Sequence, residues 1–107
     1  MTELLCLAGA LAFAIGCTVY DVTMSEKGLK AGVAVEANYT WLYGTKPTAL
    51  QYYAVFIPIV LATAGVSVAG HYLGNIGLFY GGLAAPIAVG IQHIVGGLEW
   101  RALGVKF

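Results

Sequence analysis

Charge is scarce in this sequence. Five basic and five acidic residues are all that its 107 residues contain, and the fifty-two consecutive residues from Pro47 to Leu98 include none of either kind. Charged residues make up about a quarter of a typical soluble domain, but here they make up 9%, against 60% hydrophobic residues. This composition excludes an ordinary soluble domain and indicates a membrane protein.

A surplus of positive charge is also absent. The formal net charge is zero, whereas proteins that bind nucleic acid carry clustered, unbalanced Lys and Arg. We therefore predict no nucleic-acid partner.

Cysteine is rare as well, since Cys6 and Cys17 are the only two. On one helix their Cα atoms would lie about 16 Å apart along the axis, which is beyond disulfide reach. We interpret both as small apolar packing residues, the alternatives being a thiol site or a lipidated Cys17.

The long uncharged stretch has the right length for two membrane crossings. One crossing needs about 20 apolar residues, and the polar side chains and glycine at 71–75 predict a tight reversal there. The earlier apolar run, Leu4 to Tyr20, is not preceded by Lys or Arg, so we predict a retained span and not a cleaved signal peptide. The predicted spans are about 4–22, 49–70 and 76–98.

The connection between the first two spans has a different character. It holds five of the ten charged residues, and we predict that 25–30 form a cap in water and that Gly32 breaks the helix. Residues 33–44 are apolar and aromatic but too short to span, so we predict a short interfacial or re-entrant helix there. Its aromatic residues, with two more just beyond it, are predicted to form a belt at the headgroup level: Tyr39, Trp41, Tyr43, Tyr52 and Tyr53. The predicted fold is therefore an all-α membrane protein, a single transmembrane helical domain over 1–107 with three transmembrane helices and this short segment.

Small residues form two faces on the third predicted span and a stripe on the first. Small side chains allow close helix approach in membranes, so we expect one face of the third span to pack inside the chain and the other outside it. The first face contains Gly77, Gly81, Ala85 and Ala88, the second contains Gly82, Pro86, Gly90, His93 and Gly97, and the stripe on the first span contains Ala10, Ala14, Cys17 and Asp21.

The basic residues all fall on one side of a three-span topology. Lys27, Lys30 and Lys46 lie in the first connection, and Arg101 and Lys106 follow the third span. The positive-inside rule then predicts an outer N-terminus and an inner C-terminus in a prokaryotic cytoplasmic membrane.

Few ionisable residues lie at membrane depth, and those that do are functional candidates. We predict an inner polar cluster of Asp21, Glu36, Asn38 and His93, in which Asp21, Glu36 and His93 are weak metal-ligand candidates. No metal or other cofactor is predicted, although lipid contacts are expected. The expected partner of Asp21 is one of Lys27, Lys30, Asn38 and His93.

A structural alternative assigns these residues no chemistry. In that reading Asp21 and Glu36 cap helix ends or pair with Lys27 and Lys30, and His93 bonds a backbone carbonyl between helices. His71 would then be a residue of the outer hairpin or the membrane interface.

The positions Asp21, Thr23 and Glu36-Ala37-Asn38 also carry a resemblance. Here the first half of the chain resembles a family of small, uncharacterised prokaryotic multi-pass membrane proteins. That family has Pro where Tyr39 stands in this chain. The resemblance implies that Asp21, Glu36 and Asn38 form one unit, and it implies no reaction.

Three functions compete. The first is a non-catalytic accessory subunit that packs through its small-residue faces in a larger membrane complex, with other subunits or copies of itself as partners. The second is a homo-oligomeric channel or carrier with a path lined by Thr63, Ser67, Gln92 and His93. The third is a metal-dependent intramembrane enzyme that uses the inner cluster.

Overall fold

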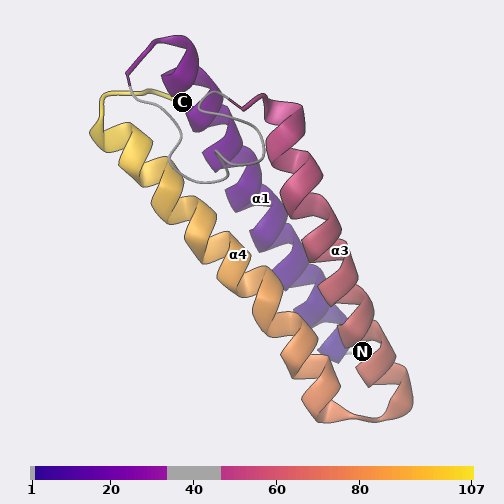
Figure 1. Ribbon diagram of the computed structural model, residues 1–107. Coiled ribbons are helices and arrows are strands. Elements are labelled where there is room, and N and C mark those ends of the chain that lie inside the picture. The colour runs from indigo at the N-terminus through magenta and orange to yellow at the C-terminus, as the bar shows by residue number, and fades with distance from the viewer. Residues whose placement is uncertain (1, 34–46) are drawn as a thin grey trace.

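Three long helices dominate the computed structural model, which describes residues 2–33 and 47–107 (Figure 1). They are α1 (Thr2–Lys30), α3 (Ala49–Leu73) and α4 (Ile76–Ala102). Each is long and apolar enough to cross a membrane, and no strand occurs in the two described ranges. The prediction of an all-helical chain with three helices able to span a membrane is thus confirmed for these ranges. Residues 34–44 of the predicted interfacial segment, and with them Glu36, Asn38 and the aromatic residues Tyr39, Trp41 and Tyr43, lie outside the described residues.

The helices extend beyond the predicted spans at the end where the basic residues gather. There α1 continues through 25–30, the stretch predicted as an aqueous cap, and α4 continues past 98 to Ala102. Polar residues sustain the helix, since Lys30 Nζ lies 2.7 Å from Glu26 Oε1, one turn earlier. Gly32 then adopts a φ of 71°, which places the break where the sequence predicted it. At 1.5 Å per residue α1 is about 43 Å long and exceeds a hydrocarbon core of about 30 Å.

The reversal between α3 and α4 is tighter than the predicted 71–75 turn. Helix α3 continues to Leu73, so only Gly74 and Asn75 form the turn. Gly74 has a φ of 67°, and Asn75 N donates to Gly70 O at 2.9 Å, as in a Schellman cap. The Asn75 side chain accepts from Leu78 N at 3.1 Å and so starts α4 at once. His71 is consequently a residue of the last turn of α3.

Helix α4 packs against both other helices, and the contacts between α1 and α3 are fewer. Buried positions on each helix recur every three or four residues, the spacing of coiled-coil-like packing. Those of α4 are Phe79, Gly82, Leu83, Pro86, Gly90, His93, Gly97 and Trp100. Those of α1 include Leu7, Ala10, Ala14, Thr18, Val22, Ser25 and Leu29.

The two small-residue faces of α4 have different surroundings. On the face that contains Gly82, a Cβ added to this glycine would lie 2.5 Å from Ser67 N and 2.6 Å from Thr63 O. The backbone of α3 therefore lies directly against the backbone of α4 at Gly82. Gly90 and Gly97 likewise receive the rings of Phe13 and Tyr20 from α1. The other face is open: a Cβ on Gly81 would meet nothing within 4 Å. One face therefore packs inside the chain, as expected, and the other remains exposed.

Candidate functional site

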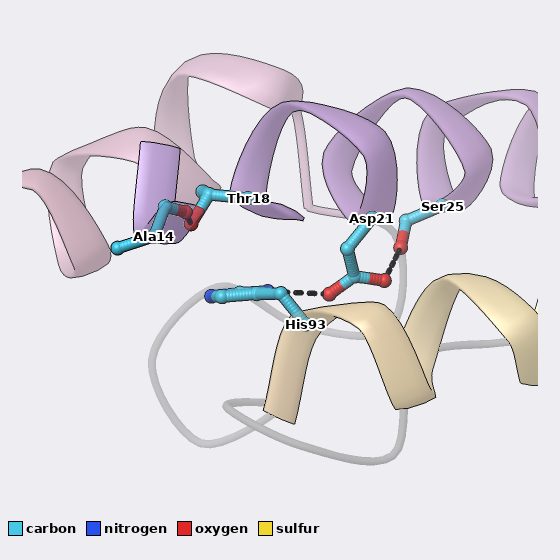
Figure 2. Close-up of polar contacts among 5 residues, drawn as sticks. All are labelled: Ala14, Thr18, Asp21, Ser25 and His93. Atoms are coloured by element: carbon cyan, nitrogen blue, oxygen red, sulfur yellow. Dashed lines mark hydrogen bonds and ion pairs between the residues drawn. The ribbon is translucent and has the colours of Figure 1, made fainter. Parts of the chain in front are cut away.

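A buried aspartate–histidine pair joins α1 to α4 (Figure 2). His93 Nδ1 lies 2.6 Å from Asp21 Oδ2, and the two side chains are 3% and 16% exposed respectively. Of the three candidate partners for Asp21 that the structure describes, His93 is the one in contact with it, and the fourth, Asn38, lies outside the described residues. Both residues belong to the seam between the helices, which explains how side chains 72 positions apart in sequence meet.

Glycine makes this approach possible. Gly96 lies one turn after His93, and a Cβ on Gly96 would be 2.8 Å from Asp21 Oδ1. A larger residue there would push the carboxylate away from α4 and from the imidazole. Gly96 was not among the residues singled out from the sequence, although its place three residues after His93 puts both on one side of the helix.

A second hydrogen bond holds the carboxylate from its own helix. Ser25 Oγ donates to Asp21 Oδ1 at 3.3 Å, so each carboxylate oxygen has one polar contact with a described residue (Figure 2). Thr18, one turn before Asp21, donates instead to Ala14 O at 2.7 Å. The carboxylate is thus fixed between a hydroxyl on α1 and an imidazole on α4.

Helix α3 closes the third side of the pair. The Phe56 ring lies edge-on to the His93 ring, with centroids 4.1 Å apart and planes 86° apart. His93 Nε2 is buried and has no hydrogen-bond partner among the residues that the structure describes. A proton on Nδ1 would be donated to the Asp21 carboxylate. This geometry suits an interhelical clamp better than a site that substrates reach from water.

The two lysines that were candidate partners of Asp21 have other contacts, and the remaining members of the predicted cluster, Glu36 and Asn38, lie outside the described residues. Lys30 bonds to Glu26, and Lys27 Nζ donates to Lys106 O at 3.2 Å and also to Phe107 O. The expectation that His93 bonds a backbone carbonyl is wrong for Nδ1, which takes a carboxylate. Asp21 does not cap a helix end either, because α1 runs on to Lys30.

Metal binding finds no ready site in the described part of the chain. No group of three or more His, Cys, Asp or Glu is placed to hold an ion there. Asp21 and His93 would supply two ligands, and the third predicted ligand, Glu36, falls outside the described ranges. The metal hypothesis therefore rests on the sequence alone.

A second acid–histidine pair lies at the opposite end of the bundle. His71 Nδ1 is 3.2 Å from Glu3 Oε2, and these side chains are 23% and 37% exposed. Sequence reasoning assigned no partner to His71 and did not consider Glu3. This pair ties the start of α1 to the end of α3.

The four residues of the hypothetical channel path do not share one face. Ser67 is fully buried and donates to Phe79 O at 2.7 Å, and Thr63 donates to Ile59 O on its own helix. His93 is buried against α1, whereas Gln92 is exposed on the outside of α4.

Gln92 extends the open face of α4. Residues 77, 81, 85, 88 and 92 follow one another at steps of four, four, three and four, so they lie on one side of a helix. All are exposed except Ala85, which is half-buried. We call this set, Gly77, Gly81, Ala85, Ala88 and Gln92, the outer α4 face.

Comparisons with protein-family models, curated proteins and solved structures give no match to this chain. The resemblance at Asp21, Thr23 and Glu36 to Asn38 therefore stays a prediction.

Proposed function

We propose that this protein is a small, non-catalytic integral membrane subunit that assembles laterally with helices of neighbouring chains through the outer α4 face. The observation that carries the proposal is the position of Gln92. Its amide lies on an exposed helix face seven residues before Glu99, which is about 10 Å inside the charged end of α4. An amide without hydrogen bonds in an apolar environment costs roughly 1–3 kcal/mol, so a partner helix that bonds it is favoured.

The rest of the outer α4 face suits such a partner. A Cβ on Gly81 would meet nothing within 4 Å, and Gly77 and Ala88 are also exposed. Small residues spaced in this way let a second helix approach closely, where van der Waals packing and an interhelical hydrogen bond drive association. Interhelical hydrogen bonds in membranes contribute about 0.6 kcal/mol on average and up to about 2 kcal/mol, so packing and Gln92 act together.

The Asp21–His93 pair has a structural role in this proposal. It fixes α1 against α4 and so holds the outer α4 face in a defined direction. The pair lies about 8 Å inside the level of Glu26 and Glu99, within the hydrocarbon region, where an unpartnered ionised group would cost several kcal/mol. Mutual pairing removes most of that cost for both groups.

We further propose that the end of the bundle bearing the basic residues faces the cytoplasm of a prokaryotic cell. Lys27, Lys30, Arg101 and Lys106 all lie at the end opposite the α3–α4 turn (Figure 1). The positive-inside rule then sets the start of α1 outside.

The test is a matched pair of substitutions in tagged protein extracted with a gentle detergent. Gly81→Leu blocks the outer α4 face, and Gly65→Leu adds the same side chain to an exposed α3 position that also has nothing within 4 Å. We expect the parent and Gly65→Leu to retain partner chains at fixed stoichiometry by native mass spectrometry, and Gly81→Leu to lose them while melting like the parent.

Each outcome is informative. Unrelated chains in the particle support the accessory subunit, whereas a ring of identical chains supports the homo-oligomeric channel or carrier. Retention of every partner by Gly81→Leu would mean that this face contacts lipid, and the proposal would be wrong.

A further inference from the structure

A cavity at the basic end of the bundle is separate from the Asp21–His93 pair. It lies between α1 and the chain that follows α4, and Tyr20 and Met24 form one side of it. Arg101, Lys106 and Phe107 form the other side. Its volume of about 500 Å³ falls within the range of about 300–1,000 Å³ typical of small-molecule sites.

The charged side chains that line this cavity are of one sign, and Lys27 Nζ donates to the main-chain oxygen of Phe107. Arg101 and Lys106 both line it, and none of its lining residues is acidic. Two carboxylates at this end of the bundle have other contacts, since Glu26 binds Lys30 and Asp21 binds His93, and the third, Glu99, is exposed. Within the described ranges no ion pair involves Arg101 or Lys106, so their charges are available to an anion.

A cationic headgroup is disfavoured at the same place. Lys27 Nζ lies 5.5 Å from the centre of the Phe107 ring, and Tyr20 stacks on that ring with centroids 5.7 Å apart. The aromatic ring that could have received a choline group is therefore already in contact with a lysine and a tyrosine.

The position is that of a lipid headgroup. Arg101 belongs to the last turn of α4, where the exposed apolar side chains of Leu98 and Leu103 flank it. Those apolar side chains are placed to contact acyl chains, and the guanidinium is placed at headgroup level. Basic pockets at the ends of transmembrane helices are typical sites for anionic lipid headgroups.

We propose that this cavity binds the phosphate of an anionic phospholipid, with Arg101 and Lys106 as its cationic ligands. Arg101 can offer two parallel N–H donors to phosphate oxygens, and Lys106 supplies a point charge. This inference does not depend on the outer α4 face, because the cavity opens between α1 and the chain after α4.

The experiment compares lipids on the purified protein in nanodiscs that contain equal amounts of phosphatidylglycerol and phosphatidylcholine with identical acyl chains. Native mass spectrometry of the released protein should show preferential retention of phosphatidylglycerol. Arg101→Gln should weaken that retention about fivefold, which corresponds to about 1 kcal/mol for one interfacial cation.

The control is Lys30→Gln, which removes the same charge from the same end but from a residue that bonds to Glu26. It should retain phosphatidylglycerol as the parent does. Should Arg101→Gln fail to fold, Lys106→Gln replaces it and should also weaken the retention of phosphatidylglycerol. The parent's own preference between the two lipids tests the proposal independently of either variant.

Two results would overturn the proposal. Equal retention of both lipids by the parent would show that the cavity does not select for negative charge. If inorganic phosphate at millimolar concentration bound in nanodiscs of phosphatidylcholine alone and displaced phosphatidylglycerol from mixed nanodiscs, the ligand would be free phosphate and not a lipid.

Discussion

Replacing Asp21 by leucine should be among the most damaging single substitutions in this protein. The change leaves His93, which is 3% exposed, without the carboxylate that lies 2.6 Å from Nδ1. Removing one member of a buried pair costs about 3–5 kcal/mol in soluble proteins, whereas single hydrogen bonds in membrane proteins contribute about 0.6–1.7 kcal/mol. Leucine would also press its methyl groups against the backbone at Gly96, and such overpacking costs about 1–3 kcal/mol.

We therefore expect the free energy of unfolding to fall by about 2–4 kcal/mol for Asp21→Leu and by about 0.5–1.5 kcal/mol for Asp21→Asn. Asparagine keeps an acceptor for His93 Nδ1 and a group that can bond Ser25. The assay is reversible unfolding in mild detergent titrated with dodecyl sulfate, followed by helical circular dichroism. A double-mutant cycle of Asp21→Leu with His93→Leu should give a coupling energy of about 1–2 kcal/mol.

The control is Glu3→Leu, which breaks the acid–histidine pair with His71 at the other end. Because those side chains are 37% and 23% exposed, we expect the free energy of unfolding to fall by less than about 1 kcal/mol. If Asp21→Leu and Glu3→Leu lowered the free energy of unfolding equally, or if the coupling energy were near zero, the claim that burial gives the Asp21–His93 pair a structural role would be refuted. If Asp21→Asn and His93→Gln each assembled normally but abolished the activity of the complex, the pair would carry protons or a ligand and would not be a clamp.

Two further predictions follow from the packing and the charge distribution. Gly82→Ala should lower the free energy of unfolding by about 1–3 kcal/mol in the same assay, because its Cβ would lie 2.5 Å from Ser67 N. Gly81→Ala in monomeric protein should unfold like the parent, and equal stability of the two variants would contradict the close approach of α3 to α4. In a variant without native cysteines, Lys106→Cys should resist an impermeant thiol reagent added outside intact cells, and Thr2→Cys should react; labelling at Lys106→Cys would reverse the proposed orientation.

The membrane architecture could be predicted because it depends on composition. In fifty-two residues without a charged side chain, polar side chains and a glycine come together at 71–75, which leaves two spans and a reversal there as the simplest solution. The helix ends could not be predicted in the same way. Hydropathy marks where a helix leaves the apolar region, but it does not mark where the helix ends. Helix α1 continues in polar sequence to Lys30, where the Glu26–Lys30 pair one turn apart stabilises it.

The candidate site was predictable only in part. The sequence identified Asp21 and His93 as ionisable residues at membrane depth, and it left four candidate partners for Asp21. The choice depends on the rotation of α1 and α4 about their axes, which tertiary packing determines. Within the predicted stripe on the first span, Ala10 and Ala14 are buried and Cys17 is half-buried, and the neighbouring Thr18, which the stripe did not include, is buried as well.

Two adjacent residues on α4 have opposite surroundings, since Gln92 is exposed and His93 is buried. Gln92 and His93 are consecutive, so their side chains point about 100° apart around the helix axis. A rotation of α4 large enough to bury Gln92 within the chain would withdraw His93 from Asp21. The buried pair therefore favours the rotation that leaves Gln92 exposed, and in the proposed assembly a partner helix would bond Gln92 best while the pair stays intact. For this reason Asp21→Leu should weaken assembly as well as stability, even though Asp21 lies on a different helix from the outer α4 face.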